Sequence, residues 1–180
     1  MHANELTVSR HIRWNNLLLT LGWIILGIAI PQMGMPQVIT GPLVNALLLI
    51  TVETTGVGAA VLVGLTTPLS ALTHGVLPLP LMIMLPFIGI ANAMLSTTYS
   101  ALKDKNKWLA LIAGAALKFF CLYSVTTWLT SAPLQVNVGR AAQALYLPPT
   151  LVTMMQWPQL VPALAGGLTA IGITCSRKHL

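Results

Sequence analysis

The stretch Leu72–Asn92, LTHGVLPLPLMIMLPFIGIAN, is almost entirely apolar, yet it contains three prolines, two glycines and one histidine. Proline removes a backbone donor and clashes with the preceding helical turn, so Pro78 and Pro80 predict that a helix ends near His74. Apolar chain resumes at Leu81. Non-helical backbone survives at membrane depth only where it is buried in protein or lines a wet cavity. We therefore expect a bent corner between two membrane helices, of the kind that forms a solute pocket.

The composition of the whole chain places it in a bilayer. Of its 180 residues, 56% are hydrophobic and 7% are charged, and the mean hydropathy is +0.81. About a quarter of the residues of a soluble domain are charged. We expect one membrane domain at residues 14–175, preceded by a tail at residues 1–13 and followed by a tail at residues 176–180.

Apolar runs long enough to span a membrane recur along the chain. A bilayer core about 30 Å thick needs roughly 20 helical residues. The clear candidates are residues 14–30, 56–73, 81–102, 108–130 and 158–175. A shorter apolar piece, residues 42–54, crosses only if the loop before it dips into the membrane. Counting this piece, we expect an all-α bundle of six transmembrane helices.

Lysine and arginine gather beside these runs, in RHIR (residues 10–13), KDKNK (residues 103–107) and SRKH (residues 176–179). Such residues collect in the short cytoplasmic loops of membrane proteins. With six spans all three groups fall on one side of the membrane, and with five spans they do not. We therefore expect cytoplasmic N- and C-termini. The net charge of +6 then reports topology, and no nucleic-acid partner is expected.

The connections on the opposite face differ in composition. Residues 30–42, 74–80 and 131–157 contain no acid and one base, Arg140, and they are rich in Pro, Gln, Asn and Met. The first of them is expected to repeat the broken corner through Pro31, Pro36 and Pro42. These patterns favour irregular outer loops, rich in proline and glycine, that line a pocket.

Four strings along the chain resemble the membrane-embedded, substrate-binding S components of energy-coupling factor (ECF) transporters. They are QVITGPLVNALLLI (37–50), GLTTPLSALTHGVLPLPLMIMLPFIGIAN (64–92), ALKFF (116–120) and MMQWPQLVPALAGG (154–167). The resemblance covers residues 14–175 in order and is strongest to a bacterial branch with no generally assigned solute. It implies a six-helix bundle in the bacterial inner (cytoplasmic) membrane that captures a vitamin-like micronutrient from outside.

The same resemblance implies partners. The S components dock on a transmembrane coupling subunit that two ATPase subunits drive, which makes them part of an ABC transporter. Docking often uses a face of small residues on the first helix. Here the nearest equivalent is Gly22, Gly27 and Ala29, in LGWIILGIAI.

Lys118 is the first candidate for a functional side chain, because it lies near the middle of an apolar run. An ammonium there costs about 2.5–3.5 kcal/mol on insertion scales and usually faces a cavity or a partner. It would pair with a carboxylate or phosphate of the solute, or else bond helix carbonyls or snorkel outward. Glu53 lies near the end of its helix, so we interpret it as a helix-end group that does not pair with Lys118.

Further polar and aromatic residues lie in the outer halves of the expected helices and in the outer corners. Asn45 and Asn92 would bond a polar edge of the solute, or equally clamp a kinked backbone. Mixed donors and acceptors suit an uncharged ring system, and aromatic rings offer stacking faces. The full set of candidate substrate-binding residues is Gln37, Thr40, Asn45, His74, Asn92, Lys118, Tyr123, Gln156, Trp157 and Gln159.

No resident cofactor or metal is expected, but two metal hypotheses remain open as alternatives. His74 with the outer methionines would ligate haem iron, so that a tetrapyrrole is the solute. The opening Met-His pair is similar to the start of cobalt and nickel S components, although Arg10 and Arg13 place this terminus inside.

Catalysis is not expected. The chain has no paired carboxylates, no nucleophile beside a base and no GxxxxGK[ST] motif, so ATP would have to be hydrolysed by partner subunits. The alternative of another class is a small membrane enzyme that uses Lys118 and His74 as acid and base. For the binding subunit, the residues favour a largely apolar solute, such as a hydrophobic organic anion.

Overall fold

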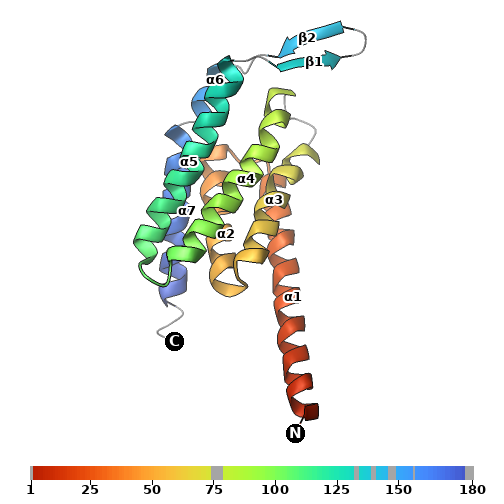
Figure 1. Cartoon of the computed structure of the whole chain (residues 1–180), viewed down its shortest axis with the longest axis vertical. Coiled ribbons are helices and arrows are strands. Elements are labelled where there is room, and N and C mark those ends of the chain that lie inside the picture. Colours follow the sequence, from red (N-terminus) through yellow and green to blue (C-terminus); the bar gives the residue numbers. More distant parts are fainter. Residues whose placement is uncertain are drawn as a thin grey trace.

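The computed structural model describes residues 2–73, 79–131, 134–138, 141–145, 149–155 and 157–176. Side chains are described within these ranges except at residues 2–13, 79–81, 134–138, 141–145, 150, 151 and 154. The described chain forms a helical bundle with a small β-hairpin at one end (Figure 1). In chain order the elements are α1 (His2–Gln32), α2 (Gln37–Thr54), α3 (Val57–Thr73), α4 (Leu79–Leu102), α5 (Lys107–Ser131), β1 (Leu134–Val138), β2 (Ala141–Leu145), α6 (Pro149–Met154) and α7 (Trp157–Ser176).

Five of the described helices are long and apolar enough to cross a membrane: the segments Trp14–Gln32, Gln37–Thr54, Met82–Leu102, Lys107–Ser131 and Trp157–Ser176. The expectation of a multi-pass helical bundle is confirmed to this extent. The remaining core helix, α3, is also apolar but has 17 residues. The sequence predicted that α2 would be shorter than α3, and this was wrong. Helix α2 begins five residues before Pro42 and has 18 residues.

The early start of α2 corrects the expected broken corner around Pro42. Pro36 is the N-cap residue, and its carbonyl accepts hydrogen bonds from the backbone N–H groups of Ile39 (2.9 Å) and Thr40 (3.0 Å). The Thr40 hydroxyl also donates to the Met35 carbonyl at 3.0 Å. These bonds establish the first turn, so that Pro42 lies inside the helix and disturbs only its N-terminal part.

The end of α3 agrees with the sequence, whereas the corner itself, residues 74–78, lies outside the described residues. Helix α3 ends at Thr73, next to the predicted end at His74, and α4 begins at Leu79. Pro80 occupies the first turn of α4, where a missing N–H leaves no helical bond unmade. Pro86 lies further inside α4.

The helices are layered so that α2 lies against α7, and α4 lies between α3 and α5, while α1 contacts mainly α3. The start of α1 and the end of α7 are at the same end of the bundle, and the hairpin is at the other (Figure 1). A core of large apolar side chains fills the bundle, including Leu48, Leu95 and Leu122. Many other large apolar side chains are exposed, as lipid-facing surfaces require.

Close contact between α2 and α7 depends on Gly166. A Cβ atom added there would overlap the Pro42 carbonyl oxygen, the Ala46 nitrogen and the Asn45 Cβ. Small residues at membrane helix interfaces permit such approach. The glycine therefore brings α7 directly against the part of α2 that carries Asn45.

The connection after α5 is more regular than expected. Residues 134–138 and 141–145 pair as antiparallel strands, with Leu134 opposite Leu145 and Val138 opposite Ala141. The letters LQVNV alternate apolar and polar residues, which is the period of a strand. The prediction of an irregular loop, which was based on proline and glycine, was wrong for these residues.

Candidate functional site

A cavity of about 330 Å³ lies in the half of the bundle away from the start of α1, since its lining includes Pro31 near the end of that helix. We call it the membrane cavity. Its walls come from the C-terminal parts of α1 and α3, the N-terminal parts of α2, α4 and α7, and the middle of α5. Six residues predicted from the sequence line it: Gln37, Thr40, Asn45, Asn92, Lys118 and Gln159.

Lys118 is the centre of a polar network at this cavity. Its side chain is only 4% exposed. The Nζ atom donates one hydrogen bond to Asn45 Oδ1 and another to Asn92 Oδ1, each 2.7 Å long. Two amide oxygens from α2 and α4 thus converge on one ammonium from α5, and the snorkelling alternative is wrong because the ammonium is held inside the bundle.

The orientation of Asn92 follows from a proline on the neighbouring helix. Pro68 has no N–H, so the carbonyl of Gly64, one turn earlier on α3, lacks its usual helical donor. Asn92 Nδ2 donates to that carbonyl at 3.0 Å, and it lies 3.4 Å from Thr67 Oγ1. With its amide nitrogen engaged in this way, Asn92 can present only its oxygen to Lys118.

Asn45 is oriented by its own helix. Its Nδ2 donates to the Gly41 carbonyl at 2.9 Å, which leaves Oδ1 for Lys118. Asn45 and Asn92 are each 2% exposed. Both asparagines therefore bond a backbone carbonyl, which is one of the two roles that the sequence left open, and both line the cavity. A bond from either asparagine to a solute stays a prediction.

The charge of Lys118 is not balanced by an acid in the described part of the chain. The ion pairs found there join Glu53 to Lys103 and Lys107. An ammonium has three N–H donors, and described side chains accept from two of those of Lys118. A buried charge held by neutral dipoles alone is costly, and an anion in the cavity would reduce that cost.

Two aromatic candidates do not line the membrane cavity. Tyr123 is 41% exposed and Trp157 is 69% exposed, and both rings lie against Phe119, with centroids 5.7 and 5.2 Å from it. Helical geometry explains the result, since Tyr123 is five residues after Lys118 and so points about 140° away from it around the helix axis. Trp157 and Gln159 are likewise on opposite faces of α7.

Two other candidates, His74 and Gln156, lie outside the described residues. The haem and metal hypotheses that rest on His74 stay predictions. Met35 and Met155 line the cavity, whereas Met33 is exposed and Met84 is buried in the core. No group of three or more His, Cys, Asp or Glu side chains within the described residues is arranged to hold a metal.

The three small residues expected to form a docking face do not share one. A Cβ atom on Gly27 would meet Val63 at 2.9 Å and Thr67 at 3.2 Å, so Gly27 is a contact between α1 and α3 inside the bundle. A Cβ on Gly22 would meet nothing within 4 Å, and Ala29 is exposed. Gly22 and Ala29 are seven residues apart and share a face of α1, whereas Gly27 is on the opposite side.

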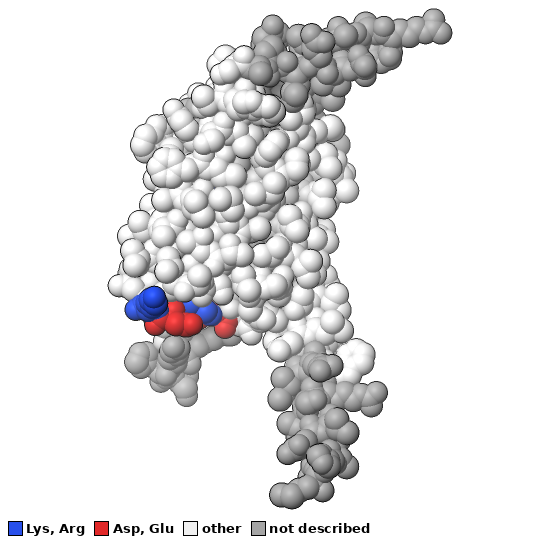
Figure 2. All heavy atoms as spheres, viewed as in Figure 1, with Lys and Arg blue, Asp and Glu red and all other residues white. Residues whose placement is uncertain are grey.

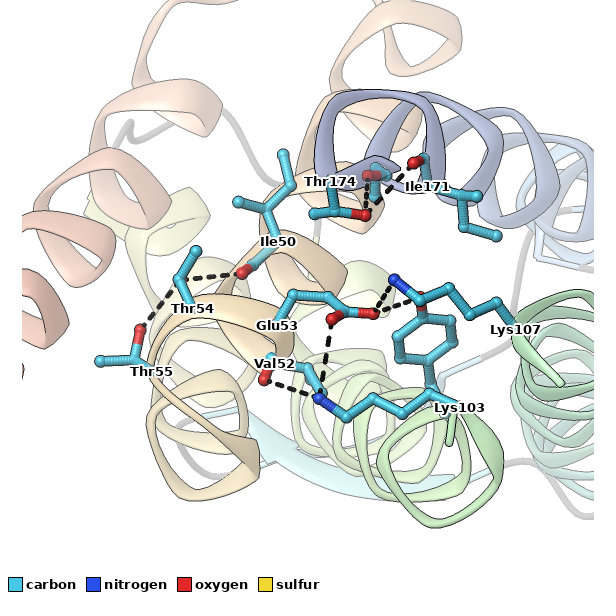
Figure 3. Close-up of polar contacts among 11 residues, drawn as sticks. Ile50, Val52, Glu53, Thr54, Thr55, Lys103, Lys107, Ile171 and Thr174 are labelled. Carbon is cyan, nitrogen blue, oxygen red and sulfur yellow. Dashed lines mark hydrogen bonds and ion pairs between the residues drawn. The ribbon is translucent and has the colours of Figure 1, made fainter. Parts of the chain in front are cut away.

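A second polar cluster lies at the other end of the bundle, around Glu53 (Figure 3). The carboxylate is 2.8 Å from Lys107 Nζ and 3.8 Å from Lys103 Nζ, and it accepts a hydrogen bond of 3.0 Å from the Tyr99 hydroxyl. Figure 2 shows that the described charged side chains on this face gather at that end. Glu53 is a helix-end group, as predicted, and it also ties α2 to the end of α4, to the loop after it and to the start of α5.

Comparisons of the chain with protein-family models, with curated proteins and with solved structures give no match. The class of protein is therefore defined by the fold and the site. The chain is a helical protein with several apolar helices suited to crossing a membrane, and it has a cavity beside a buried lysine.

Proposed function

We propose that this chain is the solute-binding S subunit of an ECF-type importer, which captures a vitamin-like, largely apolar micronutrient from outside the cell. The observation that carries the proposal is the composition of the membrane cavity. Each of the four strings that resemble S components contributes lining residues: Gln37, Thr40 and Asn45 from the first, Asn92 from the second, Lys118 from the third, and Met155 and Gln159 from the fourth.

The proposed topology has six spans, with α3 as the shortest, and cytoplasmic termini in a bacterial inner membrane. Its support is the position of charge. Lys103, Lys105 and Lys107 belong to the connection from α4 to α5, which lies at the end of the bundle where α1 begins and α7 ends (Figure 1), and positive residues favour the cytoplasmic side. The membrane cavity is in the opposite half, so it would open to the outside.

Binding fits the site better than catalysis does. Lys118 is engaged by two neutral amides, and none of the described lining residues is an acid or a histidine that would exchange a proton with it. In the proposed mechanism the chain supplies recognition, and a coupling subunit with two ATPase subunits supplies the energy for transport.

The test is purification of the tagged chain from its native membrane, with ATP-dependent uptake measured in reconstituted vesicles. We expect a membrane coupling subunit and two ATPases to copurify, and native mass spectrometry to detect a bound organic molecule of a few hundred daltons. Full ATP-dependent uptake by the isolated chain would contradict the proposal. A matched sample in which the ATPases cannot hydrolyse ATP should retain the bound molecule and lose uptake.

The topology has its own test. After replacement of Cys121 and Cys175 by alanine, single cysteines are introduced at Lys105 and at Gln143 in the hairpin. A membrane-impermeant maleimide added to intact cells should label the cysteine at position 143. It should label the one at position 105 only after the membrane is permeabilised, and the reverse pattern would invert the proposed orientation.

A further inference from the structure

The electrostatics of the membrane cavity restrict the chemistry of what it holds. Among the described residues that line it, Lys118 is the one charged side chain. Its partners Asn45 and Asn92 are neutral, and each is fixed through its amide nitrogen to a backbone carbonyl. Neither amide can turn its nitrogen toward the cavity without leaving that carbonyl bond, so this part of the site is organised around a positive charge.

The remaining donor of the ammonium defines a binding position. Asn45 and Asn92 accept from two of its three N–H groups, and Lys118 also borders the cavity. An anionic oxygen there would gain a charge-assisted hydrogen bond and would neutralise a buried cation. A neutral acceptor would gain the bond but would leave the charge uncompensated.

The rest of the cavity is mainly apolar. Val44, Ala71, Leu85 and Ile88 contribute walls from three helices, and Gln37, Thr40 and Gln159 add uncharged polar groups. At about 330 Å³, the cavity is at the lower end of the range for small-molecule sites, which is about 300–1,000 Å³. The lining therefore suits a compact molecule with an apolar body and one charged end.

Resting on the proposed function, we infer that the solute is a compact organic acid with an apolar body and a single carboxylate, which binds the third donor of Lys118. A phosphate monoester carries close to two negative charges near neutral pH and would leave one of them uncompensated beside a single buried cation. A zwitterion or an amine would place positive charge in a cavity whose described lining has no acid.

The experiment uses small-molecule extract from the native host, separated by ion exchange into anionic, neutral and cationic pools. Each pool is added to the detergent-solubilised full chain, and the thermal midpoint is measured, since a ligand that binds the folded state raises it. We expect the anionic pool to raise the midpoint by several degrees and the other pools to leave it unchanged. Treatment of the anionic pool with phosphatase should not remove the effect.

Two variants locate the effect at Lys118. Lys118→Met removes the charge, and Asn45→Asp supplies an internal carboxylate of nearly the same shape beside the ammonium. Both should lose the stabilisation by the anionic pool. Lys105→Met, which makes the same change in the exposed loop after α4, should keep it. If Lys118→Met does not fold, Asn45→Asp alone carries the test.

The outcomes separate the inference from the function on which it rests. Stabilisation by the neutral or cationic pool, or an effect that phosphatase abolishes, would overturn the single carboxylate and leave solute binding intact. Retention of the effect by Asn45→Asp would also overturn it. Failure of all three pools to stabilise the wild-type chain would instead overturn the proposed solute-binding function.

Discussion

The two polar clusters of this bundle hold lysines in opposite ways. At one end, Lys103 and Lys107 surround the carboxylate of Glu53, whose side chain is 14% exposed. In the middle of α5, Lys118 is 4% exposed and is bonded to two amides. The first cluster holds two lysines against a carboxylate at the edge of the bundle, and the second holds one lysine beside a cavity whose described lining has no acid.

This difference teaches which cluster serves structure and which is suited to a ligand. Ion pairs near the surface link the ends of helices and gain little from a further ion. A cation in the interior with no acid beside it carries a desolvation cost that two amide oxygens reduce in part and that an anionic partner would reduce further. The cavity next to Lys118 provides space for such a partner, and four predictions test the contrast.

The largest expected effect is on solute binding. Lys118→Met should weaken binding roughly 10- to 100-fold, because a hydrogen bond to a charged group contributes about 1.5–3 kcal/mol. The measurement is the dissociation constant of the molecule that copurifies with the wild-type chain. Lys105→Met is the matched control and should bind normally, and equal affinities for all three proteins would assign Lys118 to structure alone.

The next effect concerns stability and the Gly64 carbonyl of α3, which receives no helical hydrogen bond from Pro68. Asn92→Leu should destabilise the fold by about 2 kcal/mol, since it leaves one Lys118 donor without a partner and leaves the Gly64 carbonyl with only the 3.2 Å bond from the Thr67 hydroxyl. Pro68→Ala restores a backbone N–H that can reach the Gly64 carbonyl. The Asn92→Leu change should therefore cost less in the Pro68→Ala background, as measured by thermal unfolding in detergent.

That double-mutant cycle is specific to the proposed geometry. A general packing defect at position 92 would cost the same with or without Pro68. Additive effects of the two substitutions would show that Asn92 does not compensate for the missing N–H of the proline.

A smaller effect on stability is expected at the cluster around Glu53. Glu53→Gln should reduce stability by about 1 kcal/mol, because it removes two ion pairs that are partly open to solvent. Solute affinity should not change, since Glu53 does not line the membrane cavity. Asp104→Asn, an exposed acid in the adjacent loop, is the control for stability. A loss of solute binding in Glu53→Gln would contradict the separation of the two clusters.

The smallest effect is the response to salt. Raising ionic strength shortens the Debye length from about 10 Å at 0.1 M to about 3 Å at 1 M. The stability difference between wild type and Glu53→Gln should shrink in high salt, whereas the difference between wild type and Asn92→Leu should persist. Equal salt dependence of both differences would show that the two environments are not electrostatically distinct.

The sequence predicted the helices well because their signals are local. Hydropathy located the spans, and the prolines after Thr73 located the end of α3. The predicted start of α2 at Pro42 was wrong, because hydrogen bonds to the Pro36 and Met35 carbonyls form the first helical turn before that proline. The hairpin was missed although its alternation was readable in residues 134–138.

The candidate site was predicted in part. Lys118 was predicted because a single charge within an apolar run usually faces a cavity or a partner, and Asn45 and Asn92 were predicted as polar residues in the outer halves of their helices. Counting residues around a single helix would have shown that Tyr123 does not share a face with Lys118. The same count would have shown that Gly27 does not share a face with Gly22 and Ala29. The ion pairs of Glu53 with Lys103 and Lys107 could not be predicted in this way, because they depend on which helices are neighbours.

By itself, the sequence determined that this chain forms several helices long and apolar enough to cross a membrane, because composition and the spacing of prolines act through local hydrophobicity and backbone geometry. Only the tertiary structure decided that Asn45, Asn92 and Lys118 meet, since they come from three helices and are up to 73 residues apart. It also decided that both amide oxygens face the ammonium, because that depends on carbonyls that the nitrogens bond elsewhere. Long-range packing places those groups, and no local pattern encodes it.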